Sequence, residues 1–257
     1  MRCFALIFLL ALLAGCAPKP HPQLIVGMEL AYPPFETINP QGQPAGVSVE
    51  LARELGKSLG REVEIQNIPF DGLIPSLQTR KIDLIISSMT ATPERARAIA
   101  FSDPYLTTGL CLLTGKNSPI QTIAGADQPG RVLVVKKGTT GHVYTTDNIK
   151  RARVLVLDTE AACVLEVVQR KADAFIYDQI STYENWRRNA ETTRPILQPF
   201  QRESWAIGLR RDDDALRRQV NQFLRDYKAR GGFEKLGDRY LSEQKEAFRK
   251  LGCPFLF

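Results

Sequence analysis

Apolar residues along the chain fall into short runs, separated by stretches in which they recur at helical spacing. The short runs, typical of buried strands, lie at 24–26, 63–65, 82–86, 110–113, 132–135, 154–157, 174–177 and 206–209. Helical spacing predicts helices over about 51–59, 73–81, 159–170, 180–189 and 213–230. Strands that alternate with helices indicate an α/β protein, and this many strands favours two modest, mainly parallel sheets flanked by helices.

The first fifteen residues form a segment of their own. Arg2 is their only charge, and the apolar run that follows is shorter than the roughly 20 residues of a membrane-spanning helix. The run ends in Leu13-Ala-Gly-Cys16, which resembles a bacterial lipobox. We therefore expect residues 1–15 to be a lipoprotein signal peptide, Cys16 to carry the lipid, and 16–23 to include a stiff Pro-rich tether. An ordinary secretory signal with a chance cysteine is the alternative.

Composition excludes several classes of protein. The 257 residues include 34 Lys and Arg against 28 Asp and Glu, and this small basic excess is spread along the chain, so we expect no nucleic-acid partner. His21 and His142 are the only histidines, too few for a zinc site built on several. Neither a glycine-rich nucleotide motif nor a Gly-x-Ser-x-Gly elbow occurs. We expect no cofactor and no metal. Whether Cys111, Cys163 and Cys253 include a disulfide pair stays open.

Several loops that follow predicted strands carry polar or aromatic groups suited to a ligand. In open α/β sheets, ligands bind at these strand ends. In one loop, Thr92 suits a helix N-cap with Pro93 in the first helical position, and Arg95 follows. A helix N-terminus beside an arginine favours a carboxylate ligand. The other candidate loops are 29–35, 70–72, 136–141 and 177–178.

From about Leu24 to Tyr240 the chain resembles the family 3 solute-binding proteins of bacterial ABC importers for polar amino acids. The motifs that carry the resemblance are Tyr32-Pro-Pro-Phe35, Gly46-Val-Ser-Val-Glu-Leu-Ala52, Asp71-Gly-Leu-Ile-Pro-Ser-Leu77, Lys81-Ile-Asp-Leu-Ile-Ile-Ser-Ser-Met89, Thr92-Pro-Glu-Arg95, Phe101-Ser-Asp-Pro-Tyr105, Lys137-Gly-Thr-Thr140 and Ala172-Asp-Ala174. The resemblance implies a two-lobed periplasmic-binding-protein fold of type II-like form, closed by two hinge strands near 107–112 and 201–206. Lobe 1 would hold 24–109 and 204–257, and lobe 2 would hold 110–203.

The resemblance also implies a role for each matched residue in an inter-lobe cleft. Arg95 would clamp the α-carboxylate of an amino acid, and Asp178 would accept its α-ammonium group. Tyr32 and Phe70 would sandwich the ligand side chain. The remaining expected contacts are Ser87, Ser88, Thr90, Lys136, Thr139 and Thr140. The pair Ser87-Ser88, where the family usually has Ser-Gly or Ala-Gly, resembles members that bind basic amino acids.

Glu29 bears on the choice of ligand. Its position matches one where many family members carry an aspartate that meets the far end of the ligand. A buried carboxylate needs a cation or several donors, and arginine offers both. We therefore expect a basic amino acid, with arginine first and glutamine as the alternative. Glu29 pointing to solvent, or pairing with a nearby lysine, is the competing interpretation.

The function expected from this resemblance is that of a monomeric, lipid-anchored receptor of the periplasm or cell envelope. It would deliver an amino acid to the permease of an ABC importer and catalyse no reaction. Two alternatives stay open. One is an enzyme similar to cyclohexadienyl dehydratases on the same fold, with Glu29 or Asp178 as an acidic group. The other is a ligand-sensing subunit of a signalling system. The tail 241–257 is either a staple between lobes or a contact surface.

Overall fold

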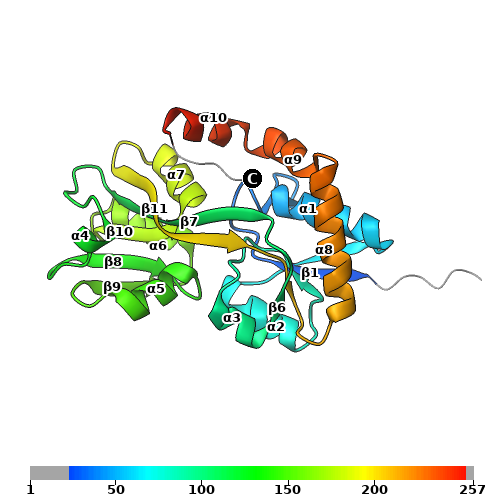
Figure 1. Ribbon diagram of the computed structural model, residues 1–257. Helices are drawn as coiled ribbons and strands as arrows, with labels where there is room; N and C mark the ends of the chain where they lie inside the picture. The colour runs from blue at the N-terminus through cyan, green and yellow to red at the C-terminus, as the bar shows by residue number, and fades with distance from the viewer. Residues whose placement is uncertain (1–22, 253–257) are drawn as a thin grey trace, which may run out of the picture.

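The computed structural model describes residues 23–252 (Figure 1). The predicted signal peptide, Cys16, most of the tether and Cys253 lie outside the described residues, so the anchoring prediction stays a prediction. No helix within 23–252 is both long enough and apolar enough to cross a membrane. The same part of the chain holds no group of three or more His, Cys, Asp or Glu side chains arranged to bind a metal ion.

The strands and helices alternate along the chain, as their apolar patterns predict. The strands are β1 (Leu24–Met28), β2 (Thr37–Ile38), β3 (Pro44–Ala45), β4 (Val63–Asn67), β5 (Leu84–Ile85), β6 (Ala100–Phe101), β7 (Leu106–Gly115), β8 (Val132–Lys136), β9 (Arg153–Leu157), β10 (Ala174–Asp178), β11 (Thr193–Trp205) and β12 (Gly208–Leu209). The helices are α1 (Val47–Leu59), the 3-10 helix η1 (Phe70–Gly72), α2 (Leu73–Gln78), α3 (Pro93–Ala98), α4 (Ile123–Ala126), α5 (Thr140–Asn148), α6 (Glu160–Val168), α7 (Gln179–Arg188), α8 (Asp214–Ala229), α9 (Gly232–Tyr240) and α10 (Ser242–Lys250).

Two five-stranded sheets form the centres of two lobes (Figure 1). The strand order is β4-β1-β5-β12-β6 in the first lobe and β11-β7-β10-β8-β9 in the second. In each sheet two neighbouring pairs are parallel and two are antiparallel. The two-lobed α/β fold is thus confirmed, but the sheets are mixed rather than mainly parallel. The antiparallel pairs arise where β7, β11 and β12 run back against their neighbours.

The long strands β7 and β11 pair antiparallel and run from one lobe into the other (Figure 1). Their register continues from Trp205 opposite Leu106 to Gln201 opposite Leu110, and then shifts at an irregularity before Ile196. The predicted hinge segment 107–112 lies within β7, and the segment 201–206 lies on β11 except for its last residue. The sequence did not predict the first half of β11, because Pro195 and Pro199 interrupt it. An edge strand tolerates proline, and β11 is the edge of its sheet.

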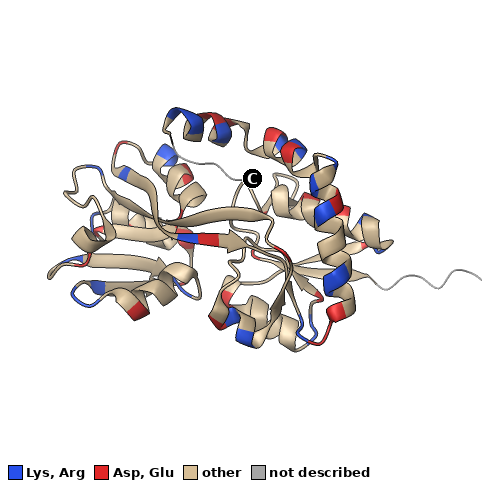
Figure 2. Ribbon diagram, in the orientation of Figure 1, with Lys and Arg blue, Asp and Glu red and all other residues tan. Residues whose placement is uncertain are grey.

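Each lobe has amphipathic helices packed against its sheet. In the first lobe, α1 and α8 bury one apolar stripe each, for example Leu55 of α1 and Val220 of α8. In the second lobe, Leu133 and Ile176 belong to a separate apolar cluster. Charged residues are frequent along α8, α9 and α10 (Figure 2). The periodicity that predicts a helix over 213–230 is confirmed by α8.

The C-terminal helices cross from one lobe to the other. Helix α9 packs on α1 and α8 of the first lobe, whereas α10 lies over α7 of the second lobe (Figure 1). Phe248 of α10 is fully buried in a cluster with Tyr183 of α7 and Leu197 of β11. The lobe boundaries at 109/110 and 203/204 stay a prediction. That prediction assigns α10 to lobe 1, whereas the contacts of Phe248 are with lobe 2.

Candidate ligand-binding site

A cleft between the two lobes encloses about 440 Å³ of space, part of it open to solvent. Both lobes and both hinge strands contribute to its walls. The lining residues are Glu29, Tyr32, Glu36, Phe70, Ser87, Ser88, Thr90, Arg95, Leu110, Thr139, Thr140, Tyr177, Asp178, Glu203 and Trp205. Most of them follow the carboxyl ends of strands, which is where open α/β sheets bind ligands.

Arg95 reaches the cleft from the start of α3. The local prediction is confirmed, since the Thr92 hydroxyl accepts a hydrogen bond from the Arg95 backbone N–H and Pro93 occupies the first helical turn. The guanidinium group donates to the Thr90 carbonyl at 2.8 Å and to the Gly138 carbonyl of the other lobe at 3.0 Å. Burial lowers the pKa of Arg95 from its usual value, and an arginine remains charged in spite of this. Arg95 thus places a cation where both lobes meet.

Glu203, on β11, lies beside this cation. One carboxylate oxygen accepts hydrogen bonds from the hydroxyls of Thr90 and Thr140, each at 3.0 Å, and the other accepts from Gln201. Burial raises the pKa of Glu203, while these hydrogen bonds and the charge of Arg95 oppose the rise. The two threonines that the sequence assigned to the ligand, one from each lobe, therefore share an internal carboxylate acceptor.

Asp178 ends β10 and caps helix α7. Its Oδ1 atom accepts hydrogen bonds from the backbone N–H groups of Ile180 and Ser181, and from the Tyr32 hydroxyl of the other lobe at 2.6 Å. Burial is the main reason why the pKa of Asp178 rises to about 7. The cap fixes the direction of the carboxyl group, which brings an acidic group of lobe 2 to face lobe 1.

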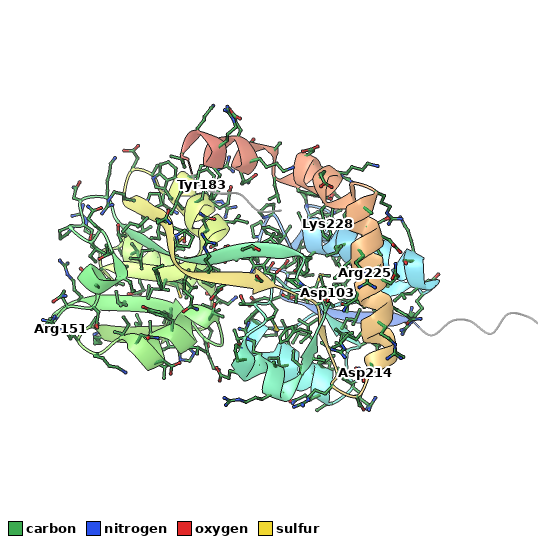
Figure 3. All side chains as sticks on the ribbon, in the orientation of Figure 1. Asp103, Arg151, Tyr183, Asp214, Arg225 and Lys228 are labelled. Carbon is green, nitrogen blue, oxygen red and sulfur yellow. The ribbon has the colours of Figure 1, made fainter. Side chains whose placement is uncertain are left out.

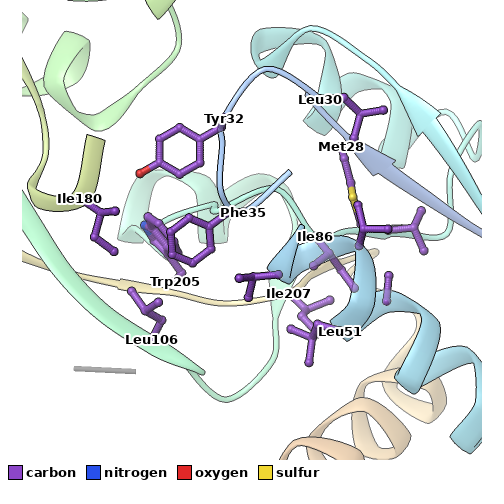
Figure 4. Close-up of a cluster of buried hydrophobic side chains, with 14 of the residues drawn as sticks. Met28, Leu30, Tyr32, Phe35, Leu51, Ile86, Leu106, Ile180, Trp205 and Ile207 are labelled. Carbon is purple, nitrogen blue, oxygen red and sulfur yellow. The ribbon is translucent and has the colours of Figure 1, made fainter. Parts of the chain in front are cut away.

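Tyr32 packs in an aromatic cluster. Its ring centroid is 5.7 Å from that of Phe35 and 6.0 Å from that of Trp205 (Figure 4). The rings of Phe35 and Trp205 pack edge to face, with their centroids 4.9 Å apart. Such packing fixes the ring of Tyr32 at the cleft wall. Phe70 packs against Arg95, with the guanidinium carbon 5.3 Å from the centre of the Phe70 ring.

Glu29 pairs with Lys136, which lies on the opposite lobe at the end of β8. The Lys136 side chain is almost fully buried and does not line the cleft. In this structure Glu29 therefore has the lysine partner that the sequence analysis gave as the alternative to a ligand contact. At the rim, Lys137 and Asp71 form a second, more exposed ion pair between the lobes at 2.9 Å.

Glu36 lies beneath the loop that follows β5. Its carboxylate oxygens accept hydrogen bonds from Ser88 at 3.1 Å and from Ser87 at 3.5 Å. Ser88 has a φ of 48°, a left-handed conformation that suits glycine. Burial raises the pKa of Glu36 to about 8.

The structure brings ten of the eleven expected contact residues to one cleft, and Lys136 is the exception. Thr139 lines the cleft, but its hydroxyl donates to the Lys136 carbonyl and caps α5, so it already has local partners. The sequence reasoning missed Glu36, Leu110, Glu203 and Trp205, and it placed Tyr177 in a candidate loop without naming it as a contact. Glu36 directly follows the Tyr32-Pro-Pro-Phe35 motif, so adjacency was the available signal for it.

The cleft has an excess of acidic groups. Four carboxyl groups line it, those of Glu29, Glu36, Asp178 and Glu203, against one lining cation, Arg95. A further cation, Lys136, pairs with Glu29. A ligand that carries positive charge would compensate this excess, because buried carboxylates need cations or several donors.

Comparisons with known proteins agree with this geometry. The L-cystine-binding protein TcyJ of Escherichia coli (strain K12) is 26% identical over 222 residues, which cover 86% of this chain and 84% of that protein. ABC transporter arginine-binding protein 1 of the same organism is 28% identical and covers 84% of this chain and 90% of its own length. A solved structure of AncCDT-1, an ancestral amino acid-binding protein and precursor of cyclohexadienyl dehydratase, superposes with a TM-score of 0.77 at 32% identity, covering 85% of this chain and 94% of that one.

A sequence model of one protein family matches nearly all of the part of the chain that forms the two lobes. The match covers residues 24–243. It includes both sheets, both hinge strands and every residue that lines the cleft. The chain therefore belongs to the bacterial extracellular solute-binding proteins, family 3.

Proposed function

We propose that this protein is an extracytoplasmic receptor that binds an amino acid in the cleft and delivers it to an ABC importer. The observation that carries the proposal is the placement of Arg95 and Asp178, a cation on one lobe and a carboxyl group on the other, at a single cleft. An amino acid carries the complementary pair, an α-carboxylate and an α-ammonium group. Ion pairs with both ends of the ligand would form fully only when the lobes close.

The ligand we propose is a basic amino acid, with arginine first and glutamine as the alternative. The four carboxyl groups of the cleft favour a cationic side chain. The rings of Tyr32 and Phe70 offer flat apolar faces on which a guanidinium group can stack. An arginine-binding protein is among the relatives, and so is a cystine-binding protein, so family membership alone leaves the ligand open.

Motion between the lobes is part of the proposal. We place the division near 109/110 and 203/204, on the hinge strands β7 and β11. Several polar contacts cross the cleft, including Tyr32 to Asp178, Glu29 to Lys136 and Asp71 to Lys137. These contacts stabilise a closed arrangement and would break when the lobes open. The receptor acts as a monomer held to the membrane by a lipid on Cys16.

An enzyme on the same fold is the second candidate function. One specific observation favours it: burial raises the pKa of Asp178 to about 7 and that of Glu36 to about 8, so protonated carboxyl groups are present in the cleft near neutral pH. Such groups can act as general acids in a dehydration. The similarity to a precursor of cyclohexadienyl dehydratase points the same way, although that precursor is itself described as an amino acid-binding protein.

The experiment that separates these functions is a thermal-shift survey of the twenty amino acids, combined with a turnover assay on prephenate. The receptor proposal predicts that basic amino acids raise the melting temperature most and that prephenate is not consumed. Turnover of prephenate that disappears in Asp178→Asn would favour the enzyme. A survey in which no amino acid shifts the melting temperature, at concentrations up to the millimolar range, would contradict the receptor.

A further inference from the structure

Three of the four carboxyl groups in the cleft already have compensating partners. Glu29 forms an ion pair with Lys136. Asp178 accepts two backbone N–H groups at the start of α7. Glu203 accepts three side-chain hydrogen bonds and is attracted by the charge of Arg95. None of these three is therefore the best placed to discriminate between a charged and a neutral ligand side chain.

Glu36 differs from them. The side chains that stabilise its ionised form are serines: the hydroxyls of Ser87 and Ser88 donate hydrogen bonds to it, and the hydroxyl of Ser48 also lowers its pKa. Glu36 is only 1% exposed. The charged groups that face it are Glu29, which repels its ionised form, and Lys136, whose own ion pair is with Glu29. Hydroxyl donors stabilise an ionised carboxylate less than a cation does.

We propose that Glu36 makes the cleft select a cationic ligand side chain, and that the ligand cation takes the place of a proton on its carboxyl group. The inference deepens the proposed function and rests on it. Before binding, the carboxyl group of Glu36 holds a proton. When a guanidinium or ammonium group enters the cleft, the O–H bond breaks, the proton passes to the solvent, and the carboxylate pairs with the cation.

The geometry supports this assignment. The Ser87 hydroxyl links Glu36 to Glu29: it donates to the Glu36 carboxyl group and accepts the backbone N–H of Glu29 at 3.0 Å. We expect Glu29 to lie at the far end of the ligand side chain, so Glu36 lies near that end as well. Tyr105 and Tyr177 also face Glu36, and burial raises the pKa of both tyrosines, so neither ionises near neutral pH. Burial raises the pKa of Glu36 to about 8, so at pH 7 it is largely protonated.

The test compares arginine with glutamine by calorimetric titration at pH 7 in two buffers of different ionisation enthalpy. Both ligands carry the same α-groups, so proton changes at Asp178 and Glu203 are common to them and cancel in the difference. Arginine binding should release most of one proton more than glutamine binding, because a group with a pKa of about 8 is largely protonated at pH 7. The preference for arginine should also increase between pH 6 and pH 8.

The variant Glu36→Gln keeps the side-chain volume and an acceptor oxygen. It should abolish the excess proton release and reduce the preference for arginine over glutamine by at least about tenfold. Equal proton release for the two ligands in the wild type would overturn the role of Glu36 and leave the receptor intact. A wild-type protein that binds neither ligand would overturn both proposals. The wild-type measurement stands even if the variant fails to fold.

A different observation concerns α10. Helix α9 is fixed to the first lobe by Phe233 and Leu236, which belong to the hydrophobic core of that lobe. The side chains of Arg239 and Tyr240 also donate hydrogen bonds to Glu50 of α1, each at 3.0 Å. Only Leu241 separates α9 from α10. The chain is therefore anchored on the first lobe immediately before it reaches the second.

Contacts of α10 with the second lobe are both apolar and polar. Phe248 packs 5.3 Å from the ring of Tyr183, which lies below α10 (Figure 3). The buried Gln244 donates to the buried Glu184 at 2.7 Å, and Arg187 pairs with Glu243. These contacts involve α7, whose first turn is capped by Asp178 of the cleft.

We infer that α10 is a third connection between the lobes, which limits how far the cleft opens. When lobe 2 swings away from lobe 1, α10 must either bend at Leu241 or leave α7 and expose Phe248. Exposure of a buried aromatic side chain is unfavourable, so the helix resists wide opening.

The test uses the full chain with Phe248→Ala and, separately, Gln244→Ala. Ligand-free scattering should show a larger radius of gyration for both variants, and the basic amino acid should dissociate several-fold faster. Glu246→Ala is the matched control, because Glu246 pairs with Arg249 and Lys250 within α10. Unchanged scattering and dissociation in both variants would overturn the inference. A variant that fails to fold leaves the other as the test.

Discussion

Asp178→Asn removes a negative charge from the cleft and leaves the local hydrogen bonds in place. The Oδ1 atom of Asp178 accepts from Tyr32 and from the backbone N–H groups of Ile180 and Ser181. An asparagine oxygen can accept all three, and asparagine is as good an N-cap as aspartate. The substitution therefore tests the charge itself, because the N-cap of α7 and the hydrogen bond from the Tyr32 hydroxyl should both be retained.

Ligand binding and stability should respond in opposite directions. Loss of one partner of a buried ion pair costs about 2–5 kcal/mol, so the dissociation constant should rise by roughly 30-fold to 4,000-fold. Burial raises the pKa of Asp178 from 3.8 to about 7. Between about pH 4 and pH 7 the folded state therefore holds the proton more tightly than the unfolded state, and the wild type loses stability as the pH rises through this window. The loss is on the order of 4 kcal/mol when complete.

The assay combines calorimetric titration with thermal unfolding at pH 5 and pH 8. The ligand-free variant should be at least as stable as the wild type at pH 8, with a smaller advantage at pH 5, although it binds ligand poorly. Asp173→Asn is a matched control, since it removes a lobe 2 carboxylate that pairs with Arg131 away from the cleft. A variant that binds within threefold of the wild type, or one whose weak binding parallels a loss of stability, would refute the reasoning.

Other substitutions probe separate parts of the account. Arg95→Ala should weaken binding by about 2–5 kcal/mol in a calorimetric titration, and an affinity within threefold of the wild type would remove Arg95 from the site. Lys137→Ala breaks the exposed pair with Asp71 at the rim, so titration should show a change in dissociation constant below about fivefold, and a larger change would mean that the rim pair governs closure. Cys16→Ala should abolish lipid labelling and leave a folded, unanchored protein, whereas an unmodified wild-type N-terminus would contradict lipid anchoring.

Local signals in the sequence account for much of the fold. The apolar stripe of α8 and the Thr92-Pro93 start of α3 were predicted correctly, because capping and amphipathic spacing depend on neighbouring residues. The sequence did not predict α10, because Phe248 is the one large apolar residue among the mostly charged and polar residues of this helix. Its burial depends on α7, which is distant in the sequence, and so no local pattern reveals it.

The candidate site divides in the same way. Motif resemblance identified Arg95 and Asp178, and both line the cleft. The pairing of Glu29 with Lys136 joins residues 107 positions apart, and it forms only when the two lobes meet. The burial of Glu203 likewise depends on threonines from both lobes. Such contacts are set by tertiary structure and cannot be read from the spacing of residues.

A calorimetric titration of refolded, ligand-free protein with L-arginine and L-glutamine tests the central claim most directly. We predict one bound arginine per chain and an affinity for arginine at least about tenfold, or 1.4 kcal/mol, above that for glutamine. Tighter binding of glutamine or of an acidic amino acid would contradict the cationic selectivity of the cleft. The absence of binding by any amino acid would contradict the receptor function itself.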